Sequence, residues 1–204
     1  VICTPTCTPP RWMLNKYPEM RRVMPDLNRS DVSSRCHVCK SSKTAREKNA
    51  LIVTEMAKTF AGVEGIIGWQ IDNELFPYDD GCFCEDCKNG FRSYLRDKFG
   101  TTEKLNKAWG MARWSLEYNS FEEIEPPYPN QWRHPSLRKA WWDYQCHLIK
   151  TFSDEQADIL HKYGCSNIGT DMMPHNFLDY YAVNEKLDVV QYNHYDAADG
   201  LFRN

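Results

Sequence analysis

The 204-residue sequence predicts an α/β fold in which parallel strands are joined by helices. Apolar strand-like runs alternate with longer segments of helical periodicity, a pattern typical of parallel strands with right-handed crossovers. Polar residues gather where strands end, at Thr4, Asn73-Glu74, Thr170-Asp171 and 193–196, as they do in a β/α barrel. No Gly-rich phosphate loop follows a strand, which favours a barrel over a doubly wound nucleotide-binding sheet. The four strands expected correspond to about half of a barrel, since a complete one takes about 250 residues.

The first half of the chain predicts two strands and one helix. The first strand is expected in "VICTPT", which Pro9-Pro10 closes. Residues 11–42 predict a long loop, because they are polar, contain prolines and lack periodicity. Residues 43–60 predict a helix, and "GVEGIIGWQID" predicts a second strand bounded by glycines. The apolar face of that helix is expected to contain Ala50, Ile52, Val53, Met56 and Phe60.

The second half predicts mostly helix. Residues 88–109 predict two short helices broken at Phe99-Gly100, and residues 121–134 predict a Pro-rich loop. A long helix is expected over 135–163, with proline in its first turn and glycine after its end. "CSNIGTDMM" and "LDVVQYNHYD" predict the last two strands, with a short helix over 175–186 between them. The apolar face of the two short helices is expected to contain Phe91, Tyr94, Leu95, Leu105 and Trp109.

The composition is that of an ordinary globular domain and narrows the range of partners. Hydrophobic residues make up 42% and charged residues 26% of the chain. The formal net charge of −3 gives no reason to expect nucleic acid or an anionic membrane as a partner. No apolar run approaches the length that crosses a bilayer. We therefore expect one domain over residues 1–204, with no nucleic-acid and no membrane partner.

Glu74 is the candidate catalytic residue that the pattern itself indicates. It follows a strand that should be buried on both faces, so its carboxyl group would lie at the rim of a barrel mouth. That position suits a general acid, and Asn73 beside it can donate an amide hydrogen bond to a substrate hydroxyl. The alternative is that Asn73 and Glu74 only cap the loop, or that Glu74 pairs with an arginine.

A group of cysteines predicts a structural metal site. Cys82, Cys84 and Cys87 have the spacing C-x-C-x-x-C, and a tetrahedral zinc site takes four ligands. Cys36 and Cys39, in the preceding loop, are both candidates for the fourth ligand. The site would join a segment at about 79–90 to the loop 33–41, and four thiolates would leave no open position for catalysis. The alternatives are disulfides or unligated thiols, although two adjacent disulfides at this spacing are geometrically awkward.

The remaining cysteines indicate packing and a reducing environment. Cys3, Cys7, Cys146 and Cys165 are expected to be packing residues. Zinc-bound thiolates favour a reducing compartment, so the expected location is the cytoplasm.

Five motifs resemble one known family in the same order along the chain. "GWQIDNEL" resembles the fourth-strand motif of glycoside hydrolase family 42, the β-galactosidases, in which an Asn-Glu pair ends strand four of a (β/α)8 TIM-type barrel. "TPTCTPPRWM", "SSRCHVC", "KFGTTEKLNKAWGMARWSLEY" and "VVQYNHYD" are similar to four further family motifs. The resemblance implies that the chain holds about strands 3 to 6 of the barrel, with the Cys-rich metal-binding insertion after strand 4.

The resemblance also implies an activity and a set of site residues. The activity is that of a retaining hydrolase that releases terminal non-reducing β-D-galactose from β-galactosides. Glu74 would be the acid/base catalyst, and Asn73 would hold the hydroxyl next to the anomeric carbon. Arg35 and Trp114 would line the sugar site, and Tyr195 would lie near the reaction centre. The family's nucleophile, a glutamate that ends strand seven, would lie outside this chain, so the isolated chain is expected to be inactive.

The same resemblance selects Cys39 as the fourth zinc ligand, together with Cys82, Cys84 and Cys87, and it implies a homotrimer. Asp171 departs from the family pattern, which often has asparagine there, and "YNHYD" lacks the usual tryptophan and proline of WDNYP. The alternatives are a related retaining glycosidase, such as an arabinopyranosidase or a fucosidase, and a non-catalytic fragment that binds carbohydrate or zinc.

Overall fold

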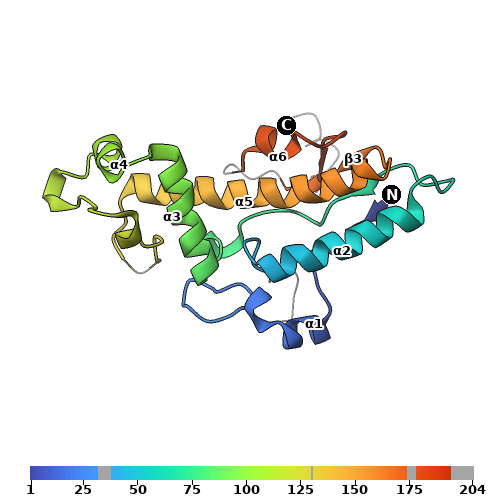
Figure 1. Cartoon of the computed structure of the whole chain (residues 1–204), viewed down its shortest axis with the longest axis horizontal. Coiled ribbons are helices and arrows are strands. Elements are labelled where there is room, and N and C mark those ends of the chain that lie inside the picture. The colour runs from blue at the N-terminus through green and yellow to red at the C-terminus, as the bar shows by residue number, and fades with distance from the viewer. Residues whose placement is uncertain (32–37, 130, 174–177, 194–204) are drawn as a thin grey trace, which may run out of the picture.

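The computed structural model describes residues 1–31, 38–129, 131–173 and 178–193 (Figure 1). Its strands are short and parallel. β1 (Ile2–Cys3) pairs with β2 (Trp69–Gln70), and β2 pairs with β3 (Ile168–Gly169). β4 (Asp171–Met172) pairs with β5 (Gln191–Tyr192), again in parallel. Only Thr170 separates β3 from β4, so one segment of chain joins the two sheets.

Two long helices lie side by side along the strands. α2 (Lys43–Phe60) begins at Ser42, whose hydroxyl accepts a hydrogen bond from the backbone N–H of Ala45. α5 (Pro135–Lys162) has proline in its first turn, as the sequence predicts. Figure 1 shows the two helices running next to each other, in close contact. Together they pack on the β1–β2–β3 sheet through one shared apolar core. This core contains Val53, Ala57, Trp69, Ile71, Ala157, Leu160 and Ile168.

The apolar face predicted for α2 is wrong in part. Val53 is fully buried, but Ile52 is 42% exposed and Phe60 is 37% exposed. The buried stripe follows a spacing of four residues and consists of Ala45, Asn49, Val53 and Ala57. Ile52 lies about 100° around the helix from Val53, because one turn takes about 3.6 residues, and so it faces away from the core.

The long loop predicted over residues 11–42 contains helix instead in its first part. α1 (Arg11–Lys16) and a 3-10 helix, η1 (Pro18–Met20), follow Pro9-Pro10. Leu14 and Met20 are buried against Val38 and Ala45, so tertiary packing stabilises helices too short to be seen as a periodic pattern.

A helical subdomain extends from one end of α5. α3 (Glu85–Phe99) and α4 (Thr102–Trp109) are separated by Gly100, whose φ of 76° ends α3. Phe91, Leu95 and Leu105 are completely buried there, as the sequence predicts. Three further 3-10 helices are η2 (Tyr78–Asp80), η3 (Arg113–Ser115) and η4 (Phe121–Glu123), and α6 (Tyr180–Asn184) covers the β4–β5 pair. Within the described residues, no helix combines the length and apolarity that a membrane span needs.

Candidate active site and cysteine cluster

Glu74 lies directly beyond β2, in a turn whose backbone is unusual. The residue is only 7% exposed. Its φ is 48° and that of Asp72 is 55°, so two non-glycine residues adopt the left-handed conformation within three positions. Each such residue costs about 1–3 kcal/mol and persists only where neighbouring groups fix it, which occurs most often at functional sites.

Hydrogen bonds from the segment directly after β1 hold the start of this turn. The backbone N–H of Asp72 donates to Thr4 Oγ1 at 2.9 Å, and the hydroxyl of Thr6 donates to Asp72 Oδ2 at 2.7 Å. Asp72 Oδ1 accepts from the backbone N–H of Asn73 at 2.8 Å. The buried carboxylate of Asp72 therefore fixes the direction in which the chain leaves the strand.

Groups from the β4–β5 pair hold Glu74 itself. Its backbone N–H donates to the backbone oxygen of Asp171 and to Asp171 Oδ1, both at 3.1 Å. The amide nitrogen of Asn193 donates to Glu74 Oε1 at 2.8 Å and to Asp171 Oδ2 at 3.1 Å. The side-chain amide of Gln70 donates to Asp171 Oδ1 at 2.8 Å. The strand ends thus place two carboxyl groups on either side of one amide group, at positions where the sequence has polar residues after its strands.

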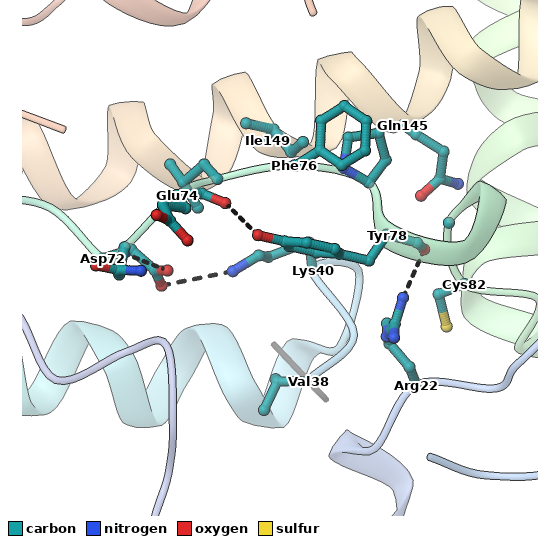
Figure 2. Close-up of a pocket in the computed structure, with 14 residues that line it drawn as sticks. Arg22, Val38, Lys40, Asp72, Glu74, Phe76, Tyr78, Cys82, Gln145 and Ile149 are labelled. Atoms are coloured by element: carbon teal, nitrogen blue, oxygen red, sulfur yellow. Dashed lines mark hydrogen bonds and ion pairs between the residues drawn. The ribbon is translucent and has the colours of Figure 1, made fainter. Parts of the chain in front are cut away.

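A small cavity lies behind Glu74, between the loops that follow β1 and β2 (Figure 2). Its volume is about 30 Å³, which is room for about two water molecules. Figure 2 shows three contacts across it: Tyr78 OH donates to the backbone oxygen of Glu74 at 3.0 Å, Lys40 Nζ lies 3.5 Å from Asp72 Oδ2, and Arg22 donates to the backbone oxygen of Tyr78 at 2.6 Å. Cys82 also lines this cavity.

The structure brings some of the predicted site residues together and separates one. Asn73 is half-buried next to Glu74 and lines the same cavity. Trp114 lies beyond α4, is 70% exposed, and packs at 6.0 Å between ring centroids on Trp132, in a different hollow. Within this chain, Trp114 therefore does not share the surroundings of Glu74. Arg35 and Tyr195 lie outside the described residues.

Sequence reasoning missed Lys40 and Asp72. Asp72 directly precedes Asn73-Glu74, and an acidic residue at a buried strand end is the signal that could have identified it. Lys40 carries no such signal, because its partner is 32 residues away along the chain.

The four predicted metal ligands form one cluster. The sulfur atoms of Cys39, Cys82, Cys84 and Cys87 all lie within 4.8 Å of one another. Sγ of Cys39 is 3.4 Å from that of Cys87 and 3.6 Å from that of Cys84. These separations are much longer than the roughly 2.05 Å of a disulfide. Cys36, the other candidate, lies outside the described residues.

The geometry and surroundings of the cluster fit a tetrahedral metal ion. Four thiolates at about 2.3 Å from zinc are about 3.8 Å apart, close to the separations found here. Backbone N–H groups of Val23 and Ser41 donate to Cys82 and Cys39, each at 3.3 Å, and such donors stabilise the thiolate form. Cys84 caps α3 by accepting from the N–H of Cys87 at 3.5 Å, which explains why the helix begins at Glu85 and not at the predicted residue 88.

The thiols influence one another's ionisation strongly. Hydrogen bonds from Cys39 lower the pKa of Cys84 and of Cys82. The pKa of Cys39 is raised, chiefly by its hydrogen bond with Cys82, and that of Cys87 is raised, chiefly by its hydrogen bond with Cys39. Four sulfurs at these distances, three of them on buried residues, cannot all ionise without a cation, so the donor set is suited to a divalent metal.

Two of the other cysteines predicted to be packing residues are buried. Cys146 is 9% exposed and Cys165 is 7% exposed, whereas Cys7 is intermediate and Cys3 is exposed at the edge strand β1. The prediction for Cys3 is therefore wrong within this chain, because β1 has a neighbouring strand on one side only among the described residues.

The chain is similar to β-galactosidases in both sequence and structure. The family profile described as β-galactosidase, that of glycoside hydrolase family 42, matches residues 1–202. The β-galactosidase Bga of Halorubrum lacusprofundi is 36% identical over 203 residues, covering 96% of this chain and 28% of the relative. A β-galactosidase of Thermus thermophilus is 35% identical over 207 residues, covering 96% and 31%.

Solved structures of the same family superpose on almost the whole chain. The polyextremophilic β-galactosidase from Halorubrum lacusprofundi has a TM-score of 0.90 at 35% identity, over 95% of this chain and 30% of that one. Gan42B, a family 42 β-galactosidase, has a TM-score of 0.90 at 26% identity, over 97% and 30%. These structural neighbours are TIM-barrel enzymes. The chain spans less than a third of the length of each of these relatives.

Proposed function

This chain belongs to glycoside hydrolase family 42, the β-galactosidase family, and on that premise we propose that it forms part of a retaining β-galactosidase in which Glu74 is the acid/base catalyst. The observation that carries the proposal is the placement of Glu74. Its carboxyl group is buried at a strand end, and an amide nitrogen 2.8 Å away orients it. A carboxyl group held in one orientation can deliver a proton along a fixed path.

The proposed reaction proceeds in two steps. Glu74 protonates the glycosidic oxygen while a second carboxylate, outside this chain, attacks the anomeric carbon, so the bond to the leaving group breaks and a glycosyl-enzyme bond forms. Glu74, now a carboxylate, then removes a proton from water as the water attacks the same carbon and releases galactose. Retention of configuration requires the two carboxyl groups to be about 5–5.5 Å apart. Asn73, on the same turn, binds the hydroxyl next to the anomeric carbon.

We assign the chain to about strands 3 to 6 of a (β/α)8 barrel, as a partial catalytic domain over residues 1–204. β1, β2, the continuous segment β3–β4, and β5 follow one another with parallel pairing, and the polar residues beside them meet at the turn of Asp72 and Glu74, which supports this assignment. Arg35 and Tyr195 complete the sugar site in the proposal. Trp114 lies in a different hollow within this chain, so its contribution to the sugar site requires a neighbouring copy in the expected homotrimer. The expected location remains the cytoplasm.

Cys39, Cys82, Cys84 and Cys87 hold a structural zinc ion in the proposal. Zinc at four thiolates supplies cross-linking and charge neutralisation, and it takes no part in the reaction. Cys39 belongs to the loop after β1, and the other three belong to the segment after β2. The cluster therefore fixes the two loops that enclose the cavity behind Glu74.

The second candidate function is hydrolysis of a different glycoside on the same scaffold, and Asp171 is the observation that favours it. Its half-buried carboxylate stands at the strand end next to Glu74, where the family often has an amide. A panel of aryl β-galactosides, α-L-arabinopyranosides and β-D-fucosides separates these activities. If none of them is hydrolysed by the complete protein, a non-catalytic carbohydrate- or zinc-binding role is favoured.

The experiment that tests the proposal is Glu74→Gln in the complete enzyme. We expect kcat/KM to fall about 100- to 10,000-fold on lactose or an alkyl β-galactoside, the usual contribution of a general acid. The loss should be much smaller on dinitrophenyl β-galactoside, whose leaving group needs no proton. Glu64→Gln is the matched control, because Glu64 is exposed before the strand and should have no effect. Equal activity of Glu74→Gln and the control on lactose would overturn the proposal.

A further inference from the structure

We propose that Asp171 is a positioning residue that holds Glu74 by its backbone and by its side chain at once. The proposal rests on the role of Glu74 as acid/base catalyst. Asp171 opens β4, one residue beyond β3, and β3 pairs with β2, the strand that precedes Glu74. It is the residue on which the hydrogen bonds around Glu74 converge.

The backbone contact opposes the strain at Glu74. Both the backbone oxygen and Oδ1 of Asp171 accept from the N–H of Glu74, each at 3.1 Å. Tyr78 OH holds the other side of the same residue by donating to its carbonyl oxygen. A glutamate at a φ of 48° needs such contacts, because the left-handed region is unfavourable for a residue with a Cβ.

The side-chain contact passes through Asn193. One nitrogen, Nδ2, contacts Glu74 Oε1 and Asp171 Oδ2, and an amide nitrogen carries two hydrogens. Each hydrogen therefore serves one carboxyl group. The reverse orientation of the amide would turn its oxygen toward two carboxyl groups, so Asp171 selects the orientation in which Asn193 donates to Glu74.

With Asn193 as its partner in this chain, an aspartate suits this position because three donors from the described residues converge on its carboxylate. Oδ1 accepts from Gln70 and from the N–H of Glu74, and Oδ2 accepts from Asn193. An asparagine has one acceptor atom and one donor atom, so in either orientation its NH₂ group would face at least one of these donors. Asp171→Asn therefore removes a contact to Glu74 with almost no change in shape.

Other charged and polar groups also face this region, and the variants used in the test leave them unchanged. They are Asp72 from the same turn, Lys40 from the loop after β1, and Tyr78 and Arg22 around the cavity. Lys40 pairs with Asp72, and Tyr78 and Arg22 hold backbone oxygens, so the link from Asp171 through Asn193 to Glu74 can be perturbed separately.

The test compares Asp171→Asn, Asn193→Asp and the double variant in the complete enzyme. Asn193→Asp sets a carboxylate against both carboxyl groups and breaks the side-chain link from its other end. We expect each single variant to lower kcat/KM about 100-fold on an alkyl β-galactoside, which is the usual effect of misplacing a catalytic group by about 1 Å. The loss on dinitrophenyl β-galactoside should be far smaller. Asp97→Asn, on the exposed side of α3, is the matched control and should have no effect.

The double variant separates a specific donor–acceptor link from a general loss of structure. It restores a donor and an acceptor between positions 171 and 193, with asparagine at 171 as in the family pattern. A carboxylate at 193 can accept from that asparagine and from the protonated carboxyl group of Glu74. We therefore expect both stability and activity on poor leaving groups to recover, at least in part. A folded double variant with no recovery, or equal losses on both substrates in folded single variants, would overturn the proposal.

Comparison with Glu74→Gln shows which proposal has failed. If Glu74→Gln keeps its activity on lactose, the role of Glu74 is wrong. If Glu74→Gln loses that activity while Asp171→Asn and Asn193→Asp match the wild type, only the positioning role is wrong. Unfolding temperatures of all variants identify any variant that fails to fold. If Asp171→Asn does not fold, Asn193→Asp still tests the link, because position 193 is half-buried at a strand end.

Discussion

Nζ of Lys40 lies 3.5 Å from Oδ2 of Asp72, and this ion pair connects the cysteine cluster to the turn that contains Glu74. Lys40 directly follows Cys39, and Asp72 lies two residues before Glu74. The side chain of Asp72 is 1% exposed and that of Lys40 is 19% exposed, so water screens the pair little. Lys40 is also held over the ring of Phe152, 3.8 Å from its centroid. A change at the cluster can therefore reach Glu74 through one contact.

Replacing Lys40 with methionine should destabilise the protein by about 1–3 kcal/mol, because it leaves the buried carboxylate of Asp72 with fewer partners. Methionine keeps the contact with Phe152, so the loss of stability reflects mainly the missing positive charge of Lys40. Urea unfolding followed by tryptophan fluorescence measures the free energy of unfolding. Lys43→Met is the control, since Lys43 is 91% exposed and pairs with Glu47 at 4.0 Å, and it should change nothing measurable. Equal effects of the two variants would contradict the proposed importance of the pair.

The sequence predicts the order of the elements and the cysteine cluster because both depend on local patterns. Alternating strand and helix segments predict parallel pairing, and the structure has parallel pairs between β1, β2 and β3. The spacing of Cys82, Cys84 and Cys87 predicts a cluster on one short segment, and the resemblance supplies Cys39. The helix over Pro135–Lys162 ends within one residue of its prediction, because proline and glycine mark its ends.

The contacts around Glu74 could not be predicted in the same way, because they depend on how strand ends meet. Asn193 and Asp171 come from segments 119 and 97 residues away from Glu74. Their polar character indicates the site, but which atom contacts which depends on the register between strands. The face of α2 was missed for a similar reason, since a rotation of one residue decides whether Ile52 or Val53 meets the core.

Cys87→Ser should remove the bound metal. The purified wild-type protein is expected to contain about one zinc ion per chain, because four thiolates at these separations form a closed tetrahedral site. The variant should contain almost none, as measured by elemental mass spectrometry. Cys165→Ser is the control, because Cys165 packs in the core around α2 and β2, away from the cluster, and its zinc content should match the wild type. Wild-type protein without any metal, with all its thiols reactive, would contradict the assignment.

Removing the metal should loosen the loops near Glu74 without unfolding the long helices. After treatment with a chelator, amide hydrogen exchange should become faster in residues 38–42 and 78–87, because the metal-bound cysteines hold these segments in place of apolar packing. The middle of α5 should keep its protection, because its buried side chains contact α2 and the strands. Unchanged exchange in both loops would show that the cluster does not stiffen them.

Asp188 should make stability depend on pH in acid. Burial raises its pKa, but the backbone N–H of Ile168 at 2.9 Å and His161 at 3.0 Å outweigh burial, so the pKa lies below the ordinary value of 3.8. A lowered pKa gives stability that is present above pH 3.8 and is lost as the pH falls through the folded-state value.

Asp188→Asn should therefore narrow the difference in unfolding free energy between pH 7 and pH 3, measured with urea at both values. Asp97→Asn should leave that difference as in the wild type. An Asp188→Asn variant with the full wild-type difference would show that Asp188 does not contribute to the acid dependence.

The central claim is that Glu74 is the acid/base catalyst, and the product formed by Glu74→Ala in the presence of azide tests it most directly. Azide fits the space left by the carboxyl group and needs no base, so it should attack the glycosyl-enzyme at the anomeric carbon and displace the enzyme's nucleophile. We predict β-galactosyl azide as the product from dinitrophenyl β-galactoside, with turnover that rises with azide concentration. α-Galactosyl azide would mean that Glu74 is the nucleophile, and wild-type turnover to galactose with no azide product would mean that Glu74 takes no part in the reaction.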